Sequence, residues 1–351
     1  MLILAIETSC DETAAAVIKD GVEILSNVIN SQVDIHQKFG GVVPEVASRH
    51  HIENIKSVVS KALAQANIKL SDIDAIAVTN TPGLVGALLV GVSYAKGLSF
   101  GLGVPLIPVN HIHAHICALF LAHPKLCEPF MPRGELVADT AKREKQAPPA
   151  FLCLVASGGH SHIIHVKDFT DFEVIARTRD DAAGEAYDKI ARILGLGYPG
   201  GPLVSKCAEN GDENFLELPR VKMADSFDYS FSGVKTSVIN YVHTCRQKGE
   251  ELRVADICAS FQRAVNEALC QHLIDAATDL KVDTIALAGG VAANQKLREL
   301  AEKFANDNNM KFYCPSAELC TDNAAMVGCS GYFNMQAGTT ADMSLNAIAT
   351  I

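Results

Sequence analysis

The chain has 351 residues, of which 48% are hydrophobic and 20% are charged, and it contains no Trp. This is a globular composition, in a chain long enough for two lobes with separate cores. The formal net charge is −10 at pH 7, which excludes a general attraction to nucleic acid, so any RNA contact must use a local basic patch.

Sequence features also bear on location. No apolar run approaches the ~20 residues of a membrane-spanning helix. The first residues lead directly into an apolar stretch at 2–6, without the basic region or cleavage site of a signal peptide. The 11 Cys form no C-x-x-C pair, which is typical of small core residues in a reducing cytosol. We therefore expect a cytoplasmic protein that is not associated with a membrane.

The chain opens with a predicted three-stranded meander. Branched or alternating patterns predict its strands, and the polar turn at 7–12 between the first two carries acids. The predicted elements of this half are strands at 2–6, 13–18 and 22–25, a helix up to residue 62, a strand at 75–78, a helix rich in small residues, a strand at 105–109 and a further helix.

A second set of elements repeats this order. After its first three strands, a mostly helical excursion runs over residues 180–272, with Asp180 and Asp181 in the first helical turn, as the helix dipole prefers. The other predicted elements are strands at 151–156, 161–166, 172–176, 284–287 and 311–313, a helix at 293–306 and a helix after the loop 320–323.

Two copies of one unit predict a duplicated α/β protein with a cleft between two lobes. Ordinary alternating α/β topology that only resembles a repeat is the alternative. In the duplicated arrangement, the helix after residue 110 and the helix after residue 322 follow the last strands of their copies. A pseudo-twofold axis would then bring both helices to one cleft.

The histidine-rich start of the first of these helices is a candidate metal site. Asn110 is a good N-cap, and His111 and His115, four residues apart, would lie on one helix face with Cβ atoms within about 6 Å, while His113 points away. Surface or core histidines are the alternative. With Asp322 from the second copy, the two imidazoles would form a three-ligand site with open positions, suited to Fe(II) or Zn(II) and to catalysis.

Three glycine turns at predicted strand ends are candidate phosphate cradles, since their backbone N–H groups can face a phosphate. Each alone is more typical of an ordinary tight turn, but three around one cleft favour a nucleotide site. The turns lie at residues 156–159, at 199–202 and at 288–290, the last with Asn294 one helical turn on. Asp188 could reach a ribose hydroxyl. The connector at 123–149 is locally basic, and we assign it no function.

These motifs resemble those of one family, the universal tRNA threonylcarbamoyladenosine transferases, whose bacterial member is called TsaD. The matching stretches cover nearly the whole chain in the right order. They lie at residues 6–13, 40–49, 82–86, 111 with 115, 157–160, 180–189, 198–202, 231–233, 288–294 and 320–325.

The resemblance implies the duplicated α/β fold of actin-like ATPases and sugar kinases (ribonuclease H-like), with two lobes around a central nucleotide and metal cleft. The first lobe would be residues 1–110, with a C-terminal helix at 323–351 packing back on it. The second lobe would be residues 111–322, with the helical insertion at about 180–272.

The resemblance also implies an acyltransferase. A partner enzyme makes threonylcarbamoyl-AMP from threonine, bicarbonate and ATP. A protein of this family passes the threonylcarbamoyl group to N6 of the adenosine next to the anticodon (position 37) in tRNAs that read ANN codons. The reaction is a metal-assisted tRNA modification in the cytoplasm.

Site residues follow from the same resemblance. His111, His115 and Asp322 would hold one divalent metal, with Fe2+ preferred and Zn2+ or Mg2+ as alternatives. Asp11 or Glu12 would orient the amine nucleophile or take its proton, with a structural turn acid as the alternative. The residues that would hold the adenylate are Val155, Ala156, Ser157, Gly158, Gly159, Asp188, Gly201 and Asn294.

The implied partners are tRNA, a TsaB-like inactive paralogue and a TsaE-like ATPase. The first alternative function is a metal-dependent ATPase or kinase of the same fold. A metalloprotease is disfavoured because a zincin helix needs Glu directly after its first His, whereas Ile112 follows His111. A non-catalytic nucleotide-binding scaffold is disfavoured by three intact metal ligands.

Overall fold

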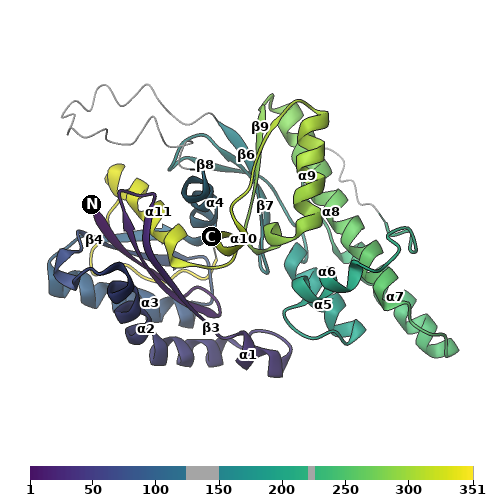
Figure 1. Cartoon of the computed structure of the whole chain (residues 1–351), viewed down its shortest axis with the longest axis horizontal. Coiled ribbons are helices and arrows are strands. Elements are labelled where there is room, and N and C mark those ends of the chain that lie inside the picture. The colour runs from purple at the N-terminus through teal and green to yellow at the C-terminus, as the bar shows by residue number, and fades with distance from the viewer. Residues whose placement is uncertain (124–149, 220–225, 351) are drawn as a thin grey trace.

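The computed structural model describes residues 1–123, 150–219 and 226–350, and it contains two five-stranded mixed sheets (Figure 1). The first sheet has the order β3-β2-β1-β4-β5 and the second the order β10-β9-β6-β7-β8. The first sheet consists of β1 Leu2–Glu7, β2 Glu12–Lys19, β3 Glu23–Ser31, β4 Ala75–Thr81 and β5 Leu106–Asn110. The second consists of β6 Phe151–Ala156, β7 Ser161–Val166, β8 Phe172–Arg177, β9 Thr284–Ala288 and β10 Lys311–Tyr313.

The two sheets have the same connectivity. β1 pairs antiparallel with β2 and parallel with β4, and β6 pairs in the same way with β7 and β9. β6 to β10 thus occupy the positions that β1 to β5 hold in the first sheet. The predicted duplicated α/β fold is confirmed.

Helices cover the outer face of each sheet. α2 Pro44–Ala66 and α3 Val85–Leu102 share a core with the first sheet, because their apolar side chains pack against its branched residues. The helices around the second sheet are α5 Ala183–Leu194, α6 Gly200–Ala208, α7 Ser232–Lys248, α8 Val254–Asp279 and α9 Gln295–Asp307. Short helices are α1 Val33–His36 and α10 Ala317–Cys320.

Two helices lie between the sheets and form the central core (Figure 1). α4 His111–Ala122 follows β5, and α11 Ala324–Gln336 follows β10 after α10. They pack on each other and on the inner faces of both sheets. A Cβ added at Gly331 would lie 2.5 Å from Cβ of Ala77, so this glycine lets α11 approach the first sheet closely. This packing brings the first turns of α4 and α11 together.

The lobe division stays a proposal, and α11 supports it by lying on the first sheet. The helix ends at Gln336, however, so the expected C-terminal helix at 323–351 is too long. The residues beyond run back along the first sheet, where the Ile348 N–H donates to the Asn80 carbonyl. Within the second lobe, α8 continues to residue 279, past the expected end of the helical insertion at about 272.

Some element boundaries differ from those predicted. β3 continues to Ser31, beyond residue 25, because it pairs with β2 along its whole length. α9 begins at Gln295 after a 3-10 turn, because the Asn294 side chain accepts the Leu297 N–H and caps the helix there.

The acids at 180 and 181 precede α5 and do not lie in its first turn, which corrects the prediction. Asp181 forms ion pairs with Lys189 of α5 and Lys235 of α7. Asp180 accepts the backbone N–H of Phe231, next to the start of α7. The two acids therefore join the beginnings of two helices.

α3 requires a correction to the expectation that no apolar run approaches spanning length. Its 18 residues are the single stretch among the described helices that is long and apolar enough to cross a membrane. The helix instead packs on β4 and α2, and its Lys96 donates to the Leu345 carbonyl. One face of this helix thus belongs to the core beside the first sheet.

Candidate metal centre

The local sequence sets where α4 begins and hence where its histidines lie. Asn110 ends β5, and its side-chain oxygen accepts the backbone N–H groups of Ile112 (2.8 Å) and His113 (3.2 Å). This confirms the predicted N-cap. His111 and His115 lie one turn apart with ring centroids separated by 4.6 Å. His113 faces elsewhere and stacks on Phe172.

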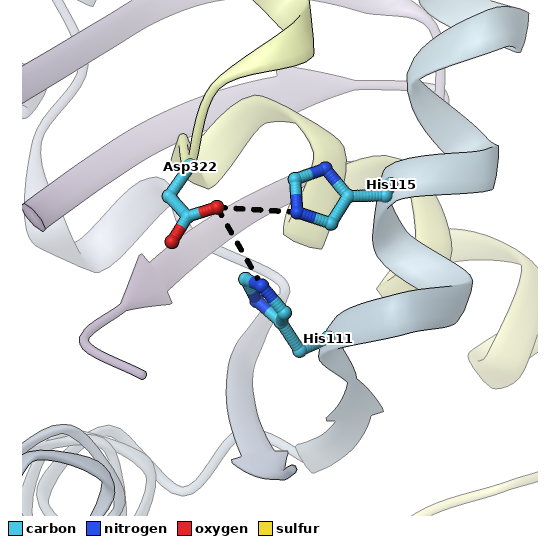
Figure 2. Close-up of side chains that lie close together, drawn as sticks. All are labelled: His111, His115 and Asp322. Carbon is cyan, nitrogen blue, oxygen red and sulfur yellow. Dashed lines mark ion pairs between the residues drawn. The ribbon is translucent and has the colours of Figure 1, made fainter. Parts of the chain in front are cut away.

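The carboxylate of Asp322 meets these two rings. The residue lies between α10 and α11, where Asn323 caps α11 by accepting the Met326 N–H. Oδ1 of Asp322 is 3.1 Å from Nε2 of His115 and 3.5 Å from Nε2 of His111 (Figure 2). One ligand atom from each residue lies within 4.8 Å of the others. The structure therefore brings the three predicted ligands together, from corresponding ends of the two repeats.

The donor set fits a divalent metal ion. Both ring nitrogens of His115 are buried and have no hydrogen-bond partner among the described residues, since the nearby Asp322 oxygen is close in distance but not aligned for a hydrogen bond. An unpaired buried polar atom is costly, and a metal at the shared point would satisfy Nε2. Burial lowers the pKa of His115, which keeps the ring neutral, as a metal ligand must be.

His111 and Asp322 carry opposite charges and shift the pKa values of each other. Burial alone would lower the pKa of His111, but Asp322 and Glu7 raise that pKa to about 9. Burial would likewise raise the pKa of Asp322, but the two histidines outweigh it and hold that pKa well below its usual range. A protonated His111 therefore faces the Asp322 carboxylate at neutral pH, and binding a metal ion through Nε2 would require this ring to release one proton.

Sequence reasoning missed one residue at this centre. Glu7, the last residue of β1, is fully buried, and its Oε2 is 3.2 Å from Nδ1 of His111. Burial would raise the pKa of Glu7, but His111 lowers it, so the carboxylate stays charged. The only signal in the sequence was an acid at the end of a buried central strand.

The predicted catalytic acids lie side by side at the turn into β2. Burial and the Asp11 carboxylate raise the pKa of Glu12 to about 10, so Glu12 keeps its proton at neutral pH. Asp322 also contributes to this shift, which places the pair within electrostatic reach of the metal centre. α2 supports the turn from behind, where Nε2 of the buried His51 donates to the Cys10 carbonyl.

The first glycine turn joins β6 to β7 and is open. A Cβ added at Gly158 or Gly159 would meet no described protein atom within 4 Å, and the same holds for Gly201 at the start of α6. Gly184 contrasts with them, because its Cβ would lie 2.6 Å from the Ser157 carbonyl oxygen. Space beside the first three glycines is therefore available to a ligand, whereas Gly184 lets α5 pack on the turn.

The other residues predicted to hold the adenylate also have structural partners. The side chains of Val155 and Ala156 are buried, so only their backbone could face a ligand. Oδ1 of Asp188 accepts the Gly200 N–H (2.7 Å), and burial raises the pKa of this carboxyl. The Asn294 amide donates to Ser205 and Gln262 (both 2.8 Å) while its oxygen caps α9.

Comparisons with known proteins agree with this architecture. A family model described as tRNA N6-adenosine threonylcarbamoyltransferase (TsaD) matches residues 23–133 and 134–329. Curated proteins of that name from Clostridioides difficile (strain 630) and Clostridium perfringens (strain 13 / Type A) are 50% and 52% identical to this chain. The alignments cover 100% and 99% of this chain and 98% and 96% of those proteins. The solved structure of T.kodakarensis HypF is similar in fold, with a TM-score of 0.61 at 14% identity over 96% of this chain and 48% of that one.

Proposed function

The chain belongs to the tRNA N6-adenosine threonylcarbamoyltransferase family, and from this premise we propose how its central cleft acts. The cleft transfers the threonylcarbamoyl group of threonylcarbamoyl-AMP to N6 of adenosine 37 in tRNAs that read ANN codons. The observation that carries this proposal is the convergence of His111, His115 and Asp322 between the two sheets. The open glycine turns on the second lobe leave space for the adenylate part of the substrate, which favours this proposal.

His111 and His115, through Nε2, and the Asp322 carboxylate would hold one divalent ion. We propose Fe2+, with Zn2+ and Mg2+ as the alternatives for a site of two imidazoles and one carboxylate. When bound, such an ion supplies Lewis-acid polarisation of the acyl carbonyl or neutralises phosphate charge.

The adenylate would lie along the second lobe. The backbone N–H groups of Ser157, Gly158 and Gly159 can donate to its phosphate, as can the start of α6 at Gly201. At Asp188, the described hydrogen bond to Gly200 uses Oδ1, which leaves Oδ2 to accept from a ribose hydroxyl. Val155, Ala156 and Asn294 would complete the pocket through backbone and amide groups.

Asp11 and Glu12 would orient the adenosine N6 or accept its proton. In the transfer, the adenosine N6 attacks the carbamoyl carbon, a C–N bond forms, the bond to the AMP oxygen breaks, and N6 loses a proton. Glu12 already holds a proton, so Asp11 is the acid left to accept a hydrogen bond or the proton from N6. The target base must leave its stack to reach the site.

The remaining partners and the location are also proposals. The acceptor is tRNA, and a TsaB-like paralogue and a TsaE-like ATPase would assist in the cytoplasm. The basic connector predicted at 123–149 lies, apart from its first residue, outside the described part of the chain. No RNA contact is proposed for it.

Nucleoside mass spectrometry tests the function directly. The protein, with the enzyme that makes the adenylate, is incubated with unmodified tRNA, and nuclease fragments locate any modified adenosine. Threonylcarbamoyladenosine at position 37 is expected. Steady ATP turnover without modified tRNA, unchanged by loss of His111 and His115, would instead identify an ATPase or kinase of this fold.

A further inference from the structure

A buried carboxylate stands directly behind one of the two candidate metal-binding histidines. Glu7 ends the central strand of the first sheet and is fully buried. The backbone N–H of Ser9 donates to its Oε1 (2.5 Å), and the Thr79 hydroxyl of the neighbouring β4 donates to its Oε2 (2.6 Å). The carboxylate is thus fixed from two sides, and its other hydrogen-bond contact within the described part of the chain is with His111.

The two nitrogens of the His111 ring face different partners. Nδ1 is 3.2 Å from Oε2 of Glu7 and 3.1 Å from the Ser9 hydroxyl, whereas Nε2 faces Oδ1 of Asp322. A carboxylate accepts only, so it selects the ring form that carries a proton on Nδ1. In that form, the Nε2 lone pair faces the place where an ion would contact His111, His115 and Asp322 together.

The contact belongs to one histidine only. Nδ1 of His115 is buried without a hydrogen-bond partner among the described residues, so no described carboxylate holds that nitrogen. The second repeat has no carboxylate at the position that corresponds to Glu7. Ile6 of β1 pairs with Val78, and Val155 of β6 pairs with Ala288, so the position matching Glu7 in the second repeat is the residue after Val155, an alanine. The carboxylate is therefore a feature of the repeat that supplies the imidazoles.

We propose that Glu7 is a positioning residue of the metal centre, which holds the Nδ1–H of His111 and thereby presents Nε2 to the ion. This inference rests on the proposed metal centre and adds an outer carboxylate to it. Outer carboxylates of this kind orient histidine ligands in metalloproteins, and losing one weakens metal binding about 10- to 100-fold.

Glu7→Gln tests the proposal with little change in shape. The glutamine can turn its amide N–H towards Nδ1, which favours the opposite ring form and removes the Nε2 lone pair. Thr79→Val is the matched control, because it removes a donor to the same carboxylate oxygen but leaves the contact with His111. The dissociation constant for Zn2+ is measured by competition with a chromophoric chelator on the full, metal-stripped chain, and unfolding is followed in the same samples.

We expect Zn2+ binding by Glu7→Gln to weaken about 10- to 100-fold, and that of Thr79→Val to stay within about twofold of the unchanged protein. In a His111→Ala background, Glu7→Gln should cause no further loss, since it acts through the missing ring. If Glu7 had a purely structural role, Zn2+ binding by Glu7→Gln and by Thr79→Val would weaken in proportion to the stability that each variant loses. Alternatively, Glu7→Gln would weaken Zn2+ binding by the same factor in the His111→Ala background as in the unchanged protein. Either result overturns the proposal.

Two further outcomes separate this proposal from the metal centre on which it rests. If the unchanged protein and His111→Ala bind Zn2+ alike, the metal centre itself is wrong. If His111→Ala loses binding while Glu7→Gln keeps it, only the role of Glu7 is wrong. Should Glu7→Gln not fold, proton NMR of the Co2+-loaded unchanged protein tests the proposal instead. We expect a shifted, exchangeable signal from the Nδ1–H of His111, which disappears in His111→Ala. Coordination of the metal through Nδ1 would abolish this signal and overturn the proposal.

Discussion

At the residue scale, the candidate metal centre makes its most direct prediction for His115. Its ring is buried and neutral, and its nitrogens have no described hydrogen-bond partner. We expect His115→Ala and Asp322→Ala to lose stoichiometric metal, measured as metal per chain after reconstitution with Fe2+ or Zn2+. His113→Ala is the control, because that ring stacks on Phe172 away from the centre and should leave metal content unchanged. Full loading of Asp322→Ala would rule out the assigned ligand set.

The glycines offer a second test at this scale. Gly158→Ala adds a methyl group where no described protein atom lies within 4 Å, so the free energy of unfolding should change by less than about 0.5 kcal/mol. Gly184→Ala places a methyl group against Ser157 and should cost about 1–3 kcal/mol. Binding of a non-hydrolysable adenylate analogue should weaken in Gly158→Ala at unchanged stability. Unimpaired binding in that variant would remove the turn from the proposed site.

Residue types and spacing were enough to predict His111, His115 and Asp322 as a group, because the helical period and the duplication together define where they lie. Glu7 could not be found in this way. Its contact with His111 spans 104 positions of the sequence, and no local pattern encodes it. Asp180 was misplaced for the same reason, since its partner on the chain lies 51 positions away.

At the element scale, α2 holds the acidic turn through a neutral histidine. The Thr13 hydroxyl lies 2.7 Å from Nδ1 of His51, and Nε2 of His51 donates to the Cys10 carbonyl, so the neutral ring has one acceptor and one donor satisfied. Burial lowers the pKa of His51 below its ordinary value.

A pH dependence follows from this pKa shift. Because the folded-state pKa is depressed, the unfolded chain takes up a proton first as the pH falls. The contribution of His51 to stability is complete above about pH 6.5 and is lost as the pH falls through the folded-state pKa, by at most about 1.4 kcal/mol per pH unit. Urea unfolding at about pH 7 and about pH 5.5 should show a smaller pH effect in His51→Gln. An equal effect in both proteins would contradict the assignment.

β6, β7 and β10 were predicted with their observed bounds, and α4 begins where its cap residue Asn110 indicated. Other bounds differ, since α2 continues to Ala66 and β4 to Thr81, beyond the predicted ends at residues 62 and 78. β3 extends to Ser31 because β2 pairs with it throughout, although the residues after 25 are not strongly apolar. The start of α9 depends on a side-chain cap at Asn294, one residue after the expected start.

At the scale of the whole molecule, the repeated order of elements was enough to predict the duplicated fold, since connectivity and short connections leave few alternatives. The position of α4 and α11 between the two sheets was not predictable in detail. It depends on close approaches such as that of Gly331 to Ala77, between segments far apart in the sequence. These approaches bring together the first turns of the two helices, and so the three candidate ligands.

Transfer of labelled threonylcarbamoyl from the adenylate to unmodified tRNA tests the central claim most directly. The rate is compared for the metal-loaded unchanged protein, His111→Ala, Asp322→Ala and the control His113→Ala, each shown to be folded. We expect transfer by the unchanged protein and by His113→Ala. The transfer rate of His111→Ala and of Asp322→Ala should fall by at least about a hundredfold, as it does when a group that stabilises charge in a transition state is removed. Undiminished transfer by His111→Ala or Asp322→Ala would contradict a reaction centred on these residues.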